Sequence, residues 1–229
     1  MTRVTIAPKT RVNGPLELIW VSTDSGGTHG VHPLVQIQVG KHAEVTLIER
    51  FIGLGAHETL TNVRLDINVD DGAQVQHAKI QKEGAAAWHF ATTIFRLGAD
   101  TSARSNIISL GAKTARNAIH VHFEKPGAEV WLDGLFVGQG QQSLDHYTVI
   151  DHKAPHCTSH ELYKGVLQGH ATGSFLGRIL MAEGAVKSAT DQLCRALLLS
   201  EDAKANVKPQ LEIDNDDVTA SHGAAIGNL

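Results

Sequence analysis

Hydrophobic and polar residues alternate with a period of two along much of this chain. In the run LVQIQVG, one side carries Val35, Ile37 and Val39 while the other carries two glutamines. Successive side chains of a strand point to opposite faces, so this alternation is typical of half-buried strands. The clearest runs, all predicted to be strands, are residues 34–40, 44–53, 63–69, 73–81, 117–125, 128–138 and 145–152.

A turn-like segment recurs between these runs. KHAEVTLI, DGAQVQHA, GADTSARS, PGAEVWLD and EGAVKSAT each place an alanine after a glycine or polar residue. These alanines are Ala43, Ala73, Ala99, Ala128 and Ala185, with spacings of 30, 26, 29 and 57 residues, the last close to two units. Such a period indicates a solenoid or array. We expect a parallel β-helix with two or three short strands per unit, whose small inward residues let coils stack; a β-sandwich with evenly spaced turns is the alternative.

Two segments near the C-terminus are harder to interpret. Residues 185–200, AVKSATDQLCRALLLS, can form either a short helix or strands, and the neighbouring β segments favour strand and turn. Residues 200–209, SEDAKANVKP, have the composition of a loop.

Composition excludes several classes of protein. Hydrophobic residues make up 42% of the chain and charged residues 19%, which is typical of a soluble globular protein. The net charge is −4 with scattered Lys and Arg, so no surface for nucleic acid or anionic membrane is expected. The chain has no apolar run of membrane-spanning length and no signal-like start. Two cysteines, Cys157 and Cys194, make no disulfide framework, and we expect reduced thiols in a cytoplasmic protein.

Motifs for catalysis are missing from the sequence. It contains no nucleotide-binding glycine loop, no HExxH and no GxSxG, so we do not expect an enzyme. A polysaccharide-active β-helix would need clustered carboxylates, for which Asp133, Asp145 and Asp151 are the candidates.

Histidine is abundant, with 14 residues. His120 and His122 would share one face of a strand, where they could chelate a metal or simply flank a core valine. A second group of candidate ligands matches no zinc module in its spacing; it comprises His152, His156, Cys157 and His160. Cys157 and Cys194 could form a redox pair only if the fold joins them.

His222 stands among very small residues in the segment SHGAAIG, next to Ser221 and Gly223. Small neighbours leave an imidazole sterically exposed, which suits a partner surface or a ligand site. The other interpretation is a tail histidine without a role.

The C-terminal third resembles the SufB/SufD family of iron–sulfur cluster assembly scaffold proteins. The resemblance rests on KPQLEI (208–213), DDV (216–218) and SHGAAIG (221–227), preceded by TDQ (190–192) and LLLS (197–200). Upstream, EVTLIERFIG, GAQVQHAKIQ and HCTSHELYKGVL agree with it, so it covers nearly the whole chain. SufD fits better than SufB, because SufB carries an acid beside the histidine and a cysteine in the loop before PQLEI.

This resemblance implies an all-β, right-handed parallel β-helix as a single core domain over residues 1–229. By this resemblance, we expect the chain to lack the helical regions that flank the core in the family, including the one on which the ATPase SufC docks. The implied function is a non-catalytic scaffold subunit that pairs through its C-terminal β-helix edge with a SufB-like partner. The alternative is a self-associating β-helix, a homodimer without cluster chemistry.

The resemblance also assigns the site. His222, with Ser221 and Gly223, would lie at the partner interface, and His222 would be an iron ligand together with ligands from the partner. SufD proteins often carry a cysteine two residues before this histidine, where this chain has Ala220. No stably bound cofactor is expected, but iron or an iron–sulfur cluster could occupy the interface transiently.

Overall fold

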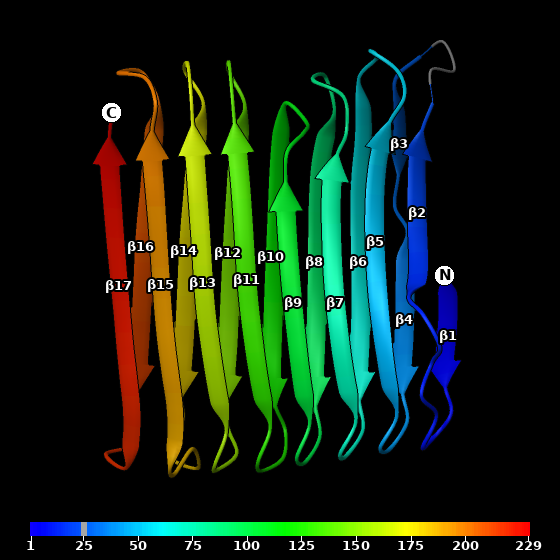
Figure 1. Ribbon diagram of the computed structural model, residues 1–229, viewed down its shortest axis with the longest axis vertical. Coiled ribbons are helices and arrows are strands. Elements are labelled where there is room, and N and C mark those ends of the chain that lie inside the picture. Colours follow the sequence, from blue (N-terminus) through cyan, green and yellow to red (C-terminus); the bar gives the residue numbers. More distant parts are fainter. Residues whose placement is uncertain (24–26) are drawn as a thin grey trace.

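Two parallel β-sheets lie face to face in the computed structural model, which describes residues 1–23 and 27–229 (Figure 1). The chain alternates between the sheets, so that each coil contributes one strand to each. One sheet comprises β1 (Thr2–Ile6), β4 (Leu34–Val39), β6 (Thr59–Val69), β8 (Trp88–Leu97), β10 (Thr114–Phe123), β12 (Ser143–His152), β14 (Thr172–Met181) and β16 (Lys204–Ile213), and β3 (His29–Val31) pairs with β6. The other comprises β2 (Leu16–Ser22), β5 (Glu44–Gly53), β7 (Gln74–Lys82), β9 (Ser102–Ser109), β11 (Glu129–Gly138), β13 (Thr158–Leu167), β15 (Ser188–Leu198) and β17 (Val218–Asn228).

Neighbouring coils stack in register. Thr114, Ser143, Thr172 and Lys204 begin successive strands of one sheet and pair directly with one another. All of the pairings between strands are parallel. The expected parallel β-solenoid is therefore confirmed, with two strands per coil. No helix that could cross a membrane occurs in the part of the chain that the structure describes.

Inward-facing positions alternate with outward-facing ones along each strand. In β11 every second residue is buried, as the period of two predicts. Bulky inward side chains lie beside glycines of a neighbouring coil. Tyr163 packs over Gly134 and Phe136 packs over Gly165, so that a methyl group at either glycine would overlap an aromatic ring. Pairing of large with small residues across coils fills the narrow space between the sheets.

The column of small residues at the start of the second-sheet strands differs in part from the predicted repeat. The column is defined by its backbone hydrogen bonds. The amide of the residue that follows each column residue donates to the carbonyl of the column residue in the preceding coil. The buried members are Ala43, Ala73, Thr101, Ala128, Cys157 and Ser188. The predicted Ala99 and Ala185 were thus out of register by two and three residues, because threonine, cysteine and serine replace alanine in this column.

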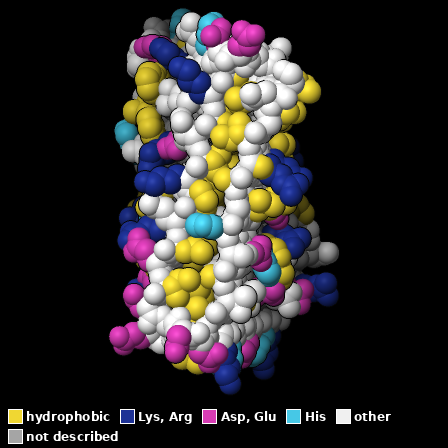
Figure 2. Space-filling view, turned by 90° about the vertical axis from the view of Figure 1, so that its left-hand side faces the viewer, with side chains coloured by type: hydrophobic (Ala, Val, Ile, Leu, Met, Phe, Trp, Pro, Cys, Tyr) yellow, Lys and Arg dark blue, Asp and Glu magenta, His cyan; other side chains and the backbone are white. Residues whose placement is uncertain are grey.

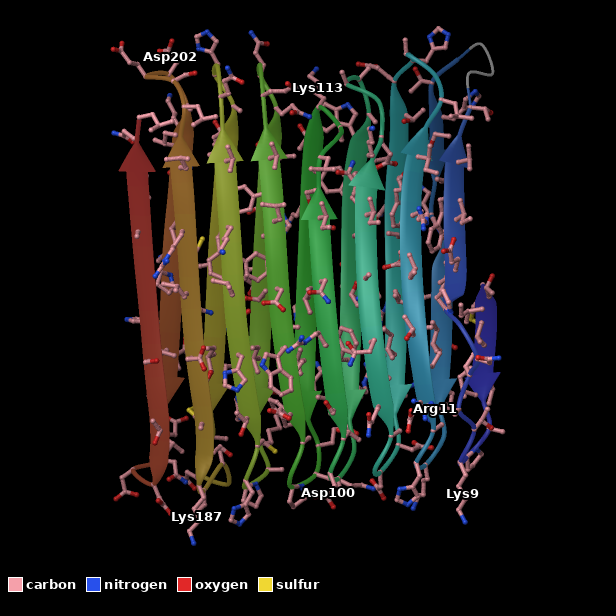
Figure 3. The ribbon with its side chains drawn as sticks, viewed as in Figure 1. Lys9, Arg11, Asp100, Lys113, Lys187 and Asp202 are labelled. Carbon is pink, nitrogen blue, oxygen red and sulfur yellow. The ribbon has the colours of Figure 1, made fainter. Side chains whose placement is uncertain are left out.

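A left-handed backbone residue precedes each small residue of this column. These residues have φ between 53° and 77° and are His42, Gly72, Asp100, Gly127, His156 and Lys187, with Lys9 in the equivalent turn of the first coil. The amide of each donates to a carbonyl of the following coil, for example His42 N to Asp71 O at 3.1 Å. Figure 3 shows Lys9, Asp100 and Lys187 at one end of the strands, with Lys113 and Asp202 at the other. The same turn therefore restarts every coil.

Near the C-terminus one prediction is confirmed and one is wrong. Residues 188–198 form strand β15, as the neighbouring segments indicated. The predicted loop at 200–209 is wrong for its second half, because β16 begins at Lys204. Its outward residues are polar and it contains Pro209, a combination that resembles a loop in sequence but is tolerated in an edge strand.

Candidate functional site

The C-terminal end of the solenoid is open. β16 and β17 are the last strands of their sheets and are paired on one side only. Ile226 and Ile213 are 49% and 44% exposed there. Core side chains at this end are only partly covered; they are Val207, Leu211, Val218 and Ala220. Figure 2, which faces this end, shows hydrophobic side chains along its middle, with a histidine among them and basic side chains at the flanks.

His222 lies on the inner face of β17. It pairs in register with Gln192 of β15, whose side chain is buried between the sheets. Because no further coil covers it, the His222 side chain is exposed, as the sequence predicted. The structure gives it no hydrogen bond or ion pair to any described residue. Ser221 is on the outer face beside Asp191, as is Gly223 beside Leu193, so only His222 of the three predicted residues faces inward.

Behind His222 lies a buried carboxylate–amide pair. Gln192 Nε2 donates to Glu161 Oε2, while Glu161 Oε1 and the amide oxygen of Gln192 have no partner among the described residues. Gly177 of the opposite sheet leaves room for the Gln192 amide, since a methyl group there would overlap Nε2. Burial raises the pKa of Glu161 to about 7, although the hydrogen bond from Gln192 favours its charged form. The row Glu161, Gln192, His222 therefore runs from the interior to the open end.

Cys194 lies in the adjacent inward row, between Tyr163 and Ala224. Burial and the nearby Glu161 carboxylate raise the pKa of its thiol to about 12. Cys194 is therefore a protonated core residue and not a reactive thiolate.

The other candidate ligands do not gather into one cluster. His120 and His122 do share the outer face of β10 and flank the buried Val121, as one of the two interpretations predicted. His122 Nδ1 lies 3.3 Å from Asp151 Oδ2, which Lys153 also contacts. His156 lies in a turn, Cys157 points inward and His160 points outward to Asp191. Residues 1–23 and 27–229 contain no group of three His, Cys, Asp or Glu side chains that could hold a metal ion.

The proposed carboxylate cluster and cysteine pair do not form either. Asp133 lies on β11 of one sheet, whereas Asp145 and Asp151 lie on β12 of the other. Both cysteines are free and belong to different inward rows, Cys157 beside Ser188 and Cys194 beside Ala224.

A polar network inside the solenoid was not anticipated from the sequence. His77 Nε2 lies 3.1 Å from Glu49 Oε2, and Nδ1 lies 2.8 Å from Ser105 Oγ. Lys79 Nζ donates to Asn117 Oδ1 at 2.7 Å, and burial lowers the pKa of Lys79 to about 8. The signal that could have indicated it is the inward placement of polar residues in QVQHAKIQ, where Val75 is followed at two-residue steps by His77 and Lys79.

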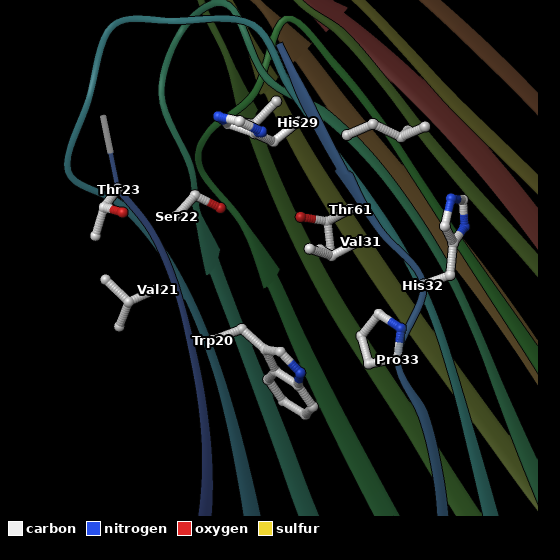
Figure 4. Close-up of a pocket in the computed structure, with 11 residues that line it drawn as sticks. Trp20, Val21, Ser22, Thr23, His29, Val31, His32, Pro33 and Thr61 are labelled. Atoms are coloured by element: carbon white, nitrogen blue, oxygen red, sulfur yellow. The ribbon is translucent and has the colours of Figure 1, made fainter. Parts of the chain in front are cut away.

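A pocket of about 520 Å³ opens at the N-terminal end of the solenoid (Figure 4). Trp20, His32 and Thr61 line it, and Trp20 stacks on Phe51 with ring centroids 4.6 Å apart. Thr61 Oγ1 donates to buried Glu83 at 2.7 Å, so the pocket floor reaches the interior network.

Fold and site together define a parallel β-solenoid protein with an uncovered terminal strand that carries a histidine. The chain belongs to the SufBD core domain family: the model described as "SUF system FeS cluster assembly, SufBD core domain" matches residues 21–229.

Relatives agree with this family. The chain is 28% identical to an iron–sulfur cluster assembly SufBD family protein of Synechocystis, over 99% of this chain and 52% of the relative. It is 28% identical to iron–sulfur cluster assembly protein SufD of Escherichia coli, over 100% of this chain and 55% of the relative. It is 31% identical to the chloroplastic protein ABCI7 of Arabidopsis thaliana, over 96% of this chain and 48% of the relative. The chain thus spans about half the length of these relatives.

Proposed function

We propose that this chain is a non-catalytic scaffold subunit in iron–sulfur cluster assembly of the SUF type, and that it pairs through β17 with a SufB-like β-solenoid. The observation that carries the proposal is the one-sided pairing of β17, with exposed Ile226 and His222 on its inner face. Membership of the SufBD core family and the likeness to a SufD protein support the process and the kind of partner.

Unpaired backbone groups of an edge strand are a template for another strand. β16 carries Pro209, a residue that blunts sheet edges, whereas β17 has no proline. The edge strand of the second sheet, β17, is therefore better suited than β16 to pair with a strand of another subunit. A partner strand there would satisfy the free backbone groups of β17 and cover Ile226.

Pairing would also bury His222 at the junction between the two subunits. A neutral imidazole is a ligand for iron, and a cluster is here the cargo of the assembly. This chain offers no thiolate beside His222, because position 220 is alanine and Cys194 is protonated. The cysteine and carboxylate ligands would therefore come from the partner.

The buried Glu49–His77–Ser105 chain has the order of a hydrolytic triad but does not argue for an enzyme. Its side chains are at most 1% exposed, so no substrate reaches Ser105. The proposed function is therefore non-catalytic. Separately, the two free thiols suit a reducing, cytoplasm-like compartment.

Analytical ultracentrifugation of the chain, alone and with a SufB-type subunit, tests the proposal. We expect a 1:1 complex that Ile226→Asp weakens roughly 10-fold or more, because a charge would enter the apolar interface. Ile19→Asp is the matched control, since Ile19 is 54% exposed on β2 at the opposite end. Iron loading of the complex should fall in His222→Ala while association persists.

The same measurement decides between the alternatives. A stable homodimer that ignores the SufB-type subunit but is broken by Ile226→Asp would support the self-associating β-solenoid instead. A complex that is insensitive to Ile226→Asp would contradict pairing through β17.

A further inference from the structure

The Gln192 amide has a defined orientation. Its Nε2 donates to Glu161 Oε2 and lies over Gly177, so the nitrogen faces the interior. An ionised carboxylate only accepts hydrogen bonds, and it therefore selects the nitrogen end of the amide. The amide oxygen must then diverge from Glu161, which lies on the preceding coil.

The Gln192 oxygen is a buried acceptor without a partner. Oε1 is inaccessible to solvent and makes no hydrogen bond to the described residues. Buried acceptors of this kind are rare in folded proteins and usually have an identifiable role. The coil that follows Gln192 in its row contributes His222.

The inner face of β17 leaves space for the imidazole to approach this oxygen. The residues two positions before and after His222 on that face are Ala220 and Ala224, both small. Because adjacent strands are about 4.8 Å apart, the side chains of His222 and Gln192 are direct neighbours in this row.

We propose that Gln192 is a positioning residue for His222: its Oε1 accepts one imidazole N–H and so directs the lone pair of the other ring nitrogen toward the partner. Glu161 anchors the amide in this orientation. Histidine ligands generally donate their second N–H to an oxygen acceptor, which fixes tautomer and ring orientation. The use of this lone pair for iron rests on the proposed function, whereas the hydrogen bond itself does not.

Two-bond ¹H–¹⁵N correlation spectra of histidine-labelled chain test the proposal, because they distinguish the two neutral tautomers. The His222 signals are assigned by their loss in His222→Ala, and spectra are recorded at pH 8, where Glu161 is ionised. We expect one dominant tautomer in the unmodified chain. Gln192→Leu should shift His222 to the tautomer mixture of free histidine, and Glu161→Gln should shift it part of the way.

Gln76→Leu is the matched control, since Gln76 is an exposed glutamine on the outer face of β7. It should leave the His222 tautomer unchanged. Circular dichroism verifies that each variant is folded, and if Gln192→Leu does not fold, Glu161→Gln decides alone. Equal tautomer populations in the unmodified chain and the folded variant, or a free-histidine mixture in the unmodified chain, would overturn the proposal.

Iron binding by the complex separates this proposal from the proposed function. If both hold, Gln192→Leu weakens iron binding about 10-fold or more without weakening subunit association. If the tautomer depends on Gln192 but His222→Ala leaves iron loading unchanged, the positioning holds and the ligand role is wrong. If iron loading needs His222 but the tautomer ignores Gln192, the ligand role holds and the positioning is wrong.

Discussion

His146 and Glu161 are buried in the same core, and burial shifts their pKa values in opposite directions. Burial, aided by the Lys79 charge, lowers the pKa of His146 to about 3, whereas burial raises the pKa of Glu161 to about 7. Glu161 thus keeps its proton well into the neutral range, while His146 stays neutral far into the acid range. His146 lies between Phe136 and Tyr163, with ring centroids 5.3 and 5.4 Å away, and neither ring nitrogen has a partner among the described residues.

His146→Leu should therefore make the protein less sensitive to acid. In the unmodified chain, the unfolded state binds a proton at His146 below pH 6.5 while the folded state does not, so stability is lost as pH falls from 6.5 toward 3. The variant lacks this loss, and its advantage should be larger at pH 4 than at pH 7 by ~3 kcal/mol. Urea unfolding at both pH values measures it. The same advantage at pH 4 and pH 7 would contradict the assignment.

At the residue scale, alternation could not predict which inward positions carry polar side chains. The period of two shows which face a residue occupies, but not whether that face accepts a charge. His77 finds Ser105 28 residues away and Lys79 finds Asn117 38 residues away. Such partners become visible only when coil lengths are known, and these vary from coil to coil.

At the scale of elements, alternation predicted β4 to β7 and β10 to β12, but the predicted runs did not include β8, β9, β13 or β14. It succeeded because both sheets bury one face and leave the other half exposed. It failed for β16, where the end of the solenoid leaves even inward residues partly exposed and the amphipathic contrast is weak. The repeat was recognised but placed out of register at Ala99, because Thr101 occupies the small-residue column.

Pairing of glycine with an aromatic ring across coils leads to a prediction for Gly134. Gly134→Ala should destabilise the protein by ~1–3 kcal/mol, because the added methyl group overlaps the Tyr163 ring in a closed core. Tyr163→Leu in the same chain should recover part of that loss. Gly227→Ala is the control, since its methyl group would meet Leu197 only at 3.8 Å. Thermal or urea unfolding gives the values, and equal effects at Gly134 and Gly227 would disprove the packing argument.

At the scale of the whole molecule, stability should decrease from the middle coils toward both ends. Coils in a solenoid contact only their neighbours, so the end coils have half the support of a central one. We expect hydrogen exchange to be faster in β2 and β17 than in β11. A SufB-type subunit should slow exchange in β17 and leave β2 unchanged. Protection of β2 instead of β17 would place the interface at the N-terminal pocket.

The site was predictable only in its exposed part. The small neighbours of His222 indicated an accessible imidazole, and the structure places it on the open strand. Glu161 and Gln192 could not be connected with it, because Gln192 lies one coil and Glu161 two coils further back in sequence. Their adjacency depends on register across β13, β15 and β17.

The left-handed turn before each second-sheet strand has a consequence for how the molecule tolerates changes in length. Because this turn restarts each coil, a residue inserted in one coil need not shift the phase of the next. Extra residues should be accommodated at an exposed turn such as 139–141, and not at 110–113, where Ala112 is buried in a core cluster. Duplication of a complete coil would preserve every column, so the solenoid can be lengthened in steps of one coil, with small insertions confined to exposed turns.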